Sequence, residues 1–121
     1  LAELAELNNG TVQCMQSNHE GQLIDWLHEA RNVADAVIIN PGGYTHTSVA
    51  LRDAVEIFPG PIIEVHLSNI AAREPFRQQS LISPVASGVV SGMGFAGYKM
   101  TVVLLCTALN EGRTDTRRQG R

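Results

Sequence analysis

Apolar residues along this chain follow two different spacings. In four segments they recur every three or four positions, the spacing of one helix face; these predicted helices are 1–7, 20–31, 45–57 and 93–109. Three other segments, 36–40, 62–67 and 85–90, are short runs rich in branched apolar residues and are predicted to be strands. Residues 11–16 are a further short strand candidate. Between the last two strands, residues 69–80 are polar and are predicted to form a loop with one short helical turn.

Helices and strands alternate, and this order determines the predicted fold class. Strands joined through helices are parallel, and the crossover connections are right-handed. We therefore predict an α/β fold, a doubly wound parallel sheet with helices on both faces. One domain over residues 1–110 accounts for the pattern, and 121 residues are enough to bury a core.

Composition narrows the function classes. With 44% apolar and 17% charged residues the chain is typical of globular proteins, and no run approaches the roughly 20 apolar residues of a membrane span. Residues 1–110 hold ten acidic against five basic side chains, which argues against nucleic acid as a partner. Residues 111–121 hold four arginines against two acids and are predicted to be a disordered basic tail.

The two cysteines, Cys14 and Cys106, have neither a CxxC spacing nor the density of a disulfide scaffold. We interpret them as buried thiols, and the expected location is the cytoplasm, which is reducing.

Glu64, His66 and Ser68 occupy alternate positions of a predicted strand and therefore share one face. A carboxylate two residues from an imidazole can fix the tautomer of the ring and raise its basicity, an arrangement typical of a general acid. The alternative is a solvated edge strand with ordinary alternation. Because the strand lies between two predicted helices, we favour the functional interpretation.

The glycine-rich segment from Asn40 to His46 follows another predicted strand. Two glycines permit a tight turn and a close approach of the backbone to a ligand. If the next helix begins near Thr45, its free N–H groups point toward an anion, with His46 on the first turn. A simple turn with an exposed histidine explains the pattern equally well.

Other polar residues have no such signal by themselves. Asp53 and Arg77, taken alone, are typical surface charges. Neither His19 nor His28 has the companions that a metal site requires, and we predict no metal.

Several of these segments together resemble one family, type II 3-dehydroquinate dehydratase. The resemblance covers about residues 1–109 in unbroken order, and it rests on S-N-H-E-G-Q-L-I-D-W-L-H-E-A-R, N-P-G-G-Y-T-H-T-S-V-A-L-R-D, E-V-H-L-S-N, A-R-E-P-F-R and S-P-V-A-S-G-V-V-S-G-M-G. It implies a flavodoxin-like three-layer fold, trimers that assemble into a dodecamer, and neither cofactor nor metal. It also implies a hydro-lyase that converts 3-dehydroquinate to 3-dehydroshikimate through an enolate, in the shikimate or quinate pathway.

The resemblance assigns roles to individual residues. His66 is expected to be the general acid that protonates the departing C1 hydroxyl, and Glu64 to orient it. Asp53 is expected to reach the site of a neighbouring subunit. The remaining residues are expected to bind the substrate, its ring hydroxyls or its carboxylate; they are Asn40, His46, Leu67 (through its backbone), Ser68 and Arg77.

One family motif, G-P-N-L-N-x-L-G-x-R-E-P-x-x-Y-G, is not found in this sequence. In the family it supplies the first strand, at the centre of the sheet, and a lid with an essential arginine and the tyrosine base. Tyr44 and Tyr98 match other family positions, so neither is expected to replace that base. We expect a truncated copy of the enzyme, and we expect a protein consisting of this piece alone to be inactive and prone to unfold.

Two alternatives remain open: an inactive homologue that binds ligand or assembles with active subunits, and a flavodoxin-like binding or receiver module. The second is disfavoured because no hydroxyl-rich phosphate loop follows residue 16 and the paired acids of a receiver are missing.

Overall fold

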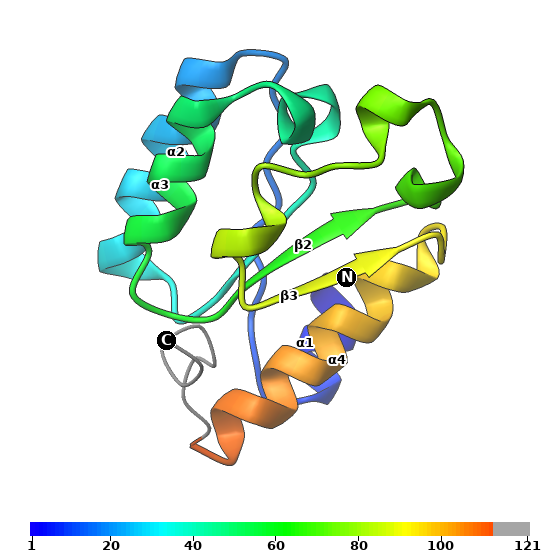
Figure 1. Cartoon of the computed structure of the whole chain (residues 1–121). Coiled ribbons are helices and arrows are strands. Elements are labelled where there is room, and N and C mark those ends of the chain that lie inside the picture. The colour runs from blue at the N-terminus through cyan, green and yellow to red at the C-terminus, as the bar shows by residue number, and fades with distance from the viewer. Residues whose placement is uncertain (113–121) are drawn as a thin grey trace.

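A parallel sheet of three strands forms the centre of the molecule (Figure 1). The strands are β1 (Val37–Ile39), β2 (Ile62–His66) and β3 (Gly88–Ser91), in the order β1-β2-β3. The structure is a computed structural model and describes residues 1–112. The predicted disordered tail lies outside the described residues from position 113 onward.

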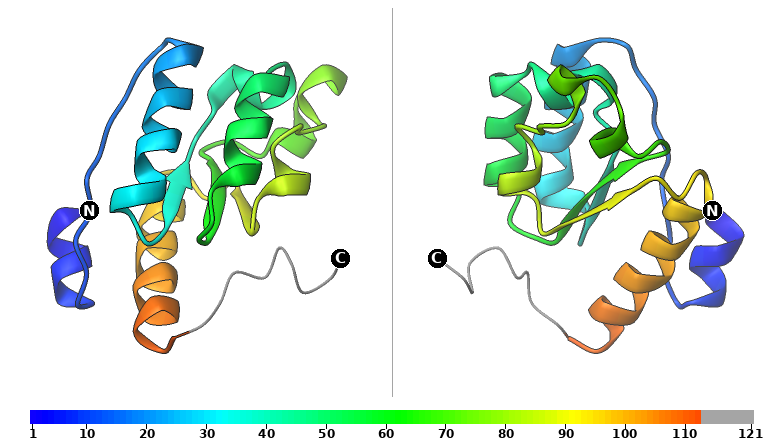
Figure 2. Two further views of the ribbon diagram at one scale, coloured as in Figure 1. Left: turned by 90° about the vertical axis from the view of Figure 1, so that its left-hand side faces the viewer. Right: turned by 45° about the vertical axis from the view of Figure 1, so that its right-hand side comes forward.

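Helices cover both faces of this sheet, which confirms the three-layer α/β fold (Figures 1 and 2). The helices α2 (Glu20–Val33) and α3 (Val49–Ile57) pack side by side on one face. The helix α4 (Ala96–Asn110) contacts all three strands on the other face, and the short α1 (Ala2–Leu7) packs against α4. Each of the four predicted helices is therefore present.

The two faces carry separate apolar cores. Beneath α2 and α3 the larger core includes Leu51, Val55, Phe58 and Ile62, all at most 1% exposed. Beneath α4 a smaller core joins Val65 and its neighbours to the helix. The helix approaches the sheet closely because Gly97 has no side chain: a Cβ there would lie 3.2 Å from Val90 Cγ1.

The start of α3 differs from the prediction. Residues Gly42–His46 form the 3-10 helix η1, and α3 begins only at Val49. The reason is Ser48, an N-cap whose Oγ accepts a hydrogen bond from Leu51 N at 2.9 Å and donates one to the Glu20 carboxylate. The prediction that free N–H groups point toward an anion near Thr45 is therefore wrong.

Two predicted strands also differ from the structure. Residues 11–16 run as an extended connection outside the sheet, because no strand within residues 1–112 forms a ladder with them (Figure 2). The last strand begins at Gly88, because Ser83–Val85, which contains Pro84, forms the 3-10 helix η4. The loop at 69–80 holds two short turns, η2 (Ile70–Ala72) and η3 (Pro75–Arg77), where one was predicted.

Both cysteines are free, but the prediction that both are buried is wrong. Cys14 lies on the exposed connection, and Cys106 on α4 is only half-buried. Within residues 1–112, none of the helices has the length and apolar character needed to cross a membrane.

Candidate active site

The strand β2 has a neighbour on each side and is buried along its whole length. The alternative of a solvated edge strand is thus excluded. Ile63 and Val65 point into the core beneath α4, whereas Glu64 and His66 point to the opposite face, toward η1 and η4. The prediction that these two polar side chains share a face is confirmed.

Glu64 and His66 are in direct contact at the end of β2. His66 Nε2 lies 2.5 Å from Glu64 Oε2, and the two side chains are 6% and 0% exposed. Thr45 Oγ1 from η1 lies 3.4 Å from both of these atoms. A buried carboxylate thereby holds one nitrogen of an imidazole, a geometry that fixes the ring orientation.

Two serines complete the surroundings of the Glu64 carboxylate. Ser83 Oγ donates to Oε1 at 2.5 Å, and Ser80 Oγ donates to Oε2 at 2.8 Å. Burial acts to raise the pKa of Glu64, but the hydrogen bonds from His66, Ser83 and Ser80 outweigh it and hold the pKa below its ordinary value of 4.5. Glu64 is therefore ionised at neutral pH.

A cavity of about 230 Å³ opens beside His66, at the carboxyl ends of β1 and β2. This is where open α/β sheets place their ligands. Its lining residues are Asn40, Gly42, Gly43, His46, His66, Leu67, Ser68, Ile70, Arg73 and Arg77.

Hydrogen bonds orient two of the polar side chains that line this cavity. Asn40 donates from Nδ2 to Tyr98 Oη at 2.9 Å, and its Oδ1 accepts from Gly42 N at 3.0 Å. Gly42 has φ +59°, which favours glycine at this turn. His46 Nδ1 lies 2.8 Å from Gln79 O, and because a carbonyl oxygen only accepts, Nδ1 is the donor in this hydrogen bond.

Two arginines give the cavity a cationic side. Arg77 Nε lies 2.5 Å from Glu74 Oε2, and its guanidinium lies 5.1 Å from the centroid of the Phe76 ring. Arg73 Nη1 donates a long hydrogen bond, 3.4 Å, to Ser68 Oγ. Guanidinium groups bind carboxylates with directed hydrogen bonds, so this side suits an anionic ligand.

The structure brings most of the predicted site residues together. Six of the eight line the cavity: Asn40, His46, His66, Leu67, Ser68 and Arg77. Glu64 lies behind His66 and acts on it. Ser68 does not continue the face of Glu64, because β2 ends at His66 and both Leu67 and Ser68 turn into the cavity. Asp53 is exposed and does not line the cavity.

Several residues of the site were not found from the sequence. Arg73 stands in the same A-R-E-P-F-R segment as Arg77, and this could have indicated it. No local sequence pattern indicates the others, because their hydrogen-bond partners lie 16–58 positions away along the chain; they are Thr45, Ser80, Ser83 and Tyr98.

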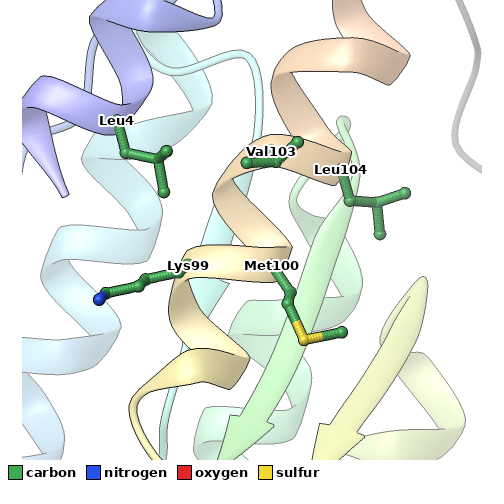
Figure 3. A pocket seen from close by; sticks show the side chains of 5 residues that line it. All are labelled: Leu4, Lys99, Met100, Val103 and Leu104. Atoms are coloured by element: carbon green, nitrogen blue, oxygen red, sulfur yellow. The ribbon is translucent and has the colours of Figure 1, made fainter.

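A larger hollow of about 490 Å³ lies between α1 and α4 and has a different character (Figure 3). Leu4 faces it from α1, and Lys99, Met100, Val103 and Leu104 face it from α4. With only the Lys99 amine as a polar group, it offers no means to orient a polar substrate. Within residues 1–112, no group of three His, Cys, Asp or Glu side chains could hold a metal ion.

Comparison with known proteins identifies the family of this chain. The family model described as dehydroquinase class II matches residues 1–106. The chain is 54% identical over 92 residues to 3-dehydroquinate dehydratase 1 of Agrobacterium fabrum. This alignment covers 76% of this chain and 63% of that protein. The chain is also 56% identical over 102 residues to 3-dehydroquinate dehydratase of Pelotomaculum thermopropionicum, covering 84% and 71%.

A solved structure gives the same result for the fold. The type II dehydroquinase of Propionibacterium acnes superposes with a TM-score of 0.84 at 36% identity, covering 87% of this chain and 72% of that one. The sequence therefore spans about two thirds of the length of such relatives. The matching family model and these relatives together show that the chain belongs to the class II dehydroquinase family.

Proposed function

We propose that this chain carries the substrate cavity and the acid group of a 3-dehydroquinate dehydratase, a hydro-lyase that forms 3-dehydroshikimate. One observation supports this most directly. His66 lines a polar cavity while its Nε2 is held by the buried, ionised Glu64. The named relatives dehydrate 3-dehydroquinate, as their names state.

The dehydration needs a base and an acid in succession. Removing the proton next to the ketone leaves an enolate, and the enolate electrons then form the new C=C bond as the C–O bond of the neighbouring hydroxyl breaks. The imidazolium of His66 gives its Nδ1 proton to that departing oxygen, which leaves as water. His66 is then neutral: its Nε2 keeps its proton and donates it in a hydrogen bond to the Glu64 carboxylate.

The substrate is an anion with several hydroxyl groups, and the cavity offers matching partners. Arg77 and Ser68, with the backbone of Leu67, supply donors for the hydroxyls and the carboxylate. Asn40 and His46 supply a further donor and acceptor near the strand ends. Among the described lining residues there is no tyrosine and no carboxylate, and the family resemblance places the base in the N-terminal motif that this sequence lacks.

The test compares two proteins: the 121-residue chain and the same chain preceded by the family's N-terminal motif. Both are mixed with 3-dehydroquinate, binding is measured by calorimetry, and product is followed by its enone absorbance. We expect the chain with the motif to bind and turn over the substrate, and the short chain to turn it over at least about 10²–10⁴-fold more slowly, the usual contribution of a positioned base. Equal rates would show that the motif does not supply the base. Absence of binding in both would refute the proposed function.

We also propose that the protein self-associates into trimers and dodecamers in the cytoplasm. Exposed apolar side chains, including Phe76 at 66% and Val49 at 61%, support association, and the free cysteines fit a reducing compartment. Asp53, exposed on α3, would then complete the site of a neighbouring subunit. Analytical ultracentrifugation tests the assembly, and a monomer at micromolar concentration would contradict it.

A further inference from the structure

The Glu64 carboxylate is held by a second element besides the histidine, the turn from Ser80 to Ser83. Both serine hydroxyls of this turn donate to Glu64, one to each oxygen: Ser80 Oγ to Oε2 and Ser83 Oγ to Oε1. Neither serine lines the cavity. Their hydroxyl groups therefore bind the Glu64 carboxylate and are not placed to bind a ligand in the cavity.

The direction of the Ser80 hydrogen bond is fixed by its other contacts. Ser80 Oγ accepts from Ile82 N at 3.0 Å and from Ser83 N at 2.9 Å. A hydroxyl has two acceptor lone pairs and one proton. With both lone pairs engaged, the proton of Ser80 can only be donated, and the group that lies in hydrogen-bond reach of it is Glu64.

The turn itself is anchored to the helical layer. Leu81 N donates to Thr45 O at 2.8 Å, and Arg52 Nη1 on α3 donates to Leu81 O at 3.1 Å. The buried Ile82 side chain, 0% exposed, fastens the turn in the larger core. The two hydroxyls are thus held in place independently of any ligand.

A third hydroxyl, Thr45 Oγ1 on η1, lies 3.4 Å from both Glu64 Oε2 and His66 Nε2, a longer contact than those of the two serines. The remaining neighbours of Glu64 are apolar or engaged elsewhere. Its register neighbours in the sheet are Ile39 on β1 and Val89 on β3, both apolar. Arg52 is the α3 cation engaged with the turn, and Glu20 on α2 is engaged with Ser48. From β2 itself the titratable neighbour is His66.

We propose that the Ser80–Ser83 turn is a positioning element that makes Glu64 an acceptor only, so that the proton shared by the Glu64–His66 pair resides on His66 Nε2. Nδ1, which has no hydrogen-bond partner within residues 1–112, is then the nitrogen that serves the cavity. The lowered pKa of Glu64 agrees with this geometry. This inference depends on the proposed function in one respect only, the role of His66 as the general acid.

The experiment is an NMR titration of the 121-residue chain without substrate, with ¹³C at the Glu64 carboxyl and ¹⁵N in the His66 ring. We expect Ser83→Ala to move the protonation midpoint of Glu64 upward by about one pH unit, because one hydrogen bond to the ionised form is lost. Ser83→Thr keeps the hydroxyl and is expected to return the midpoint toward that of the unsubstituted chain. An unchanged midpoint in folded Ser83→Ala would overturn the proposal.

Ser87→Ala is the matched control. Ser87 Oγ accepts from Ile62 N at the first residue of β2, so this variant also loses a hydrogen bond to the strand but none to Glu64. Its Glu64 midpoint is expected to stay unchanged, and a shift equal to that of Ser83→Ala would overturn the proposal.

A second measurement needs no variant. In the unsubstituted chain, the neutral His66 ring is expected to carry its proton on Nε2, read from the ¹⁵N shifts of the two nitrogens. A proton on Nδ1 would overturn the proposal. Because none of these readouts uses substrate, they stand apart from the binding test of the proposed function.

Discussion

The cavity has two sides that are built differently. One side, called the acid side after the role proposed for His66, consists of His66 and the groups behind it: Glu64, Thr45, Ser80 and Ser83. The binding side consists of the loop-borne residues Asn40, His46, Leu67, Ser68, Arg73 and Arg77. On the acid side Glu64 and His66 are buried, whereas on the binding side most side chains are exposed.

This difference has a physical reason. A buried carboxylate is tolerated only when its oxygens are paired, and within residues 1–112 no buried side-chain nitrogen or oxygen lacks a hydrogen-bond partner. The acid side is therefore part of the core, and a change there alters folding as well as chemistry. The binding side, named after its proposed role, is largely exposed, and we expect a change there to alter affinity with little effect on stability.

The largest expected effect comes from removing the carboxylate. Glu64→Ala leaves His66, Ser80 and Ser83 without their acceptor, and we expect the free energy of unfolding to fall by about 3–5 kcal/mol. Urea denaturation measures this. The matched change on the binding side, Arg77→Ala, breaks a partly exposed ion pair and is expected to cost less than about 1 kcal/mol. Equal losses would show that the two sides do not differ.

Protonating the same carboxylate is a milder perturbation. Because the pKa of Glu64 is lower in the folded chain than in the unfolded chain, its ionised form contributes stability above the ordinary value of 4.5. That contribution is lost as the pH falls through the folded-state pKa. In thermal unfolding from about pH 7 to about pH 3, we expect Glu64→Gln to lose less stability than the unsubstituted chain. Parallel curves would contradict a lowered pKa.

On the binding side, the largest expected loss of affinity comes from removing the Arg77 guanidinium. Arg77→Ala removes a charged hydrogen-bond donor from the cavity, and we expect the Kd for 3-dehydroquinate to rise by about 10–100-fold. Isothermal calorimetry measures this. Arg31→Ala is the control, because Arg31 is exposed on α2 and, within residues 1–112, its side chain makes one hydrogen bond, from Nε to His28 O at 3.4 Å. A similar loss in both variants would indicate a general effect of charge.

The smallest expected change in affinity concerns Tyr98, which does not line the cavity but holds Asn40, which does. Tyr98→Phe removes the acceptor of Asn40 Nδ2, which is then free to rotate, and we expect the Kd to rise by about 2–10-fold. Tyr44→Phe is the matched control, since its hydroxyl donates to Asn18 O at 2.7 Å, away from the lining residues. If Tyr98→Phe binds as tightly as the control, Asn40 does not depend on Tyr98.

Most of the helices and the central strands could be predicted from the sequence because their signals are local. The run at Val37–Ile39 and the alternation at Ile62–His66 identify buried strands without knowledge of their partners. Residues 11–16 show the limit of this reasoning. A strand exists only when another strand completes its hydrogen bonds, and that partner is not a property of the segment itself.

The site divides in the same way. Sequence alone placed Glu64 beside His66 and put Asn40 and His46 after a neighbouring strand, because period-two alternation and parallel topology determine these positions. Only the tertiary structure brought Ser80 and Ser83 to the carboxylate and Tyr98 to Asn40. These contacts join segments 16–58 residues apart, and their distances depend on how helices, turns and sheet pack together.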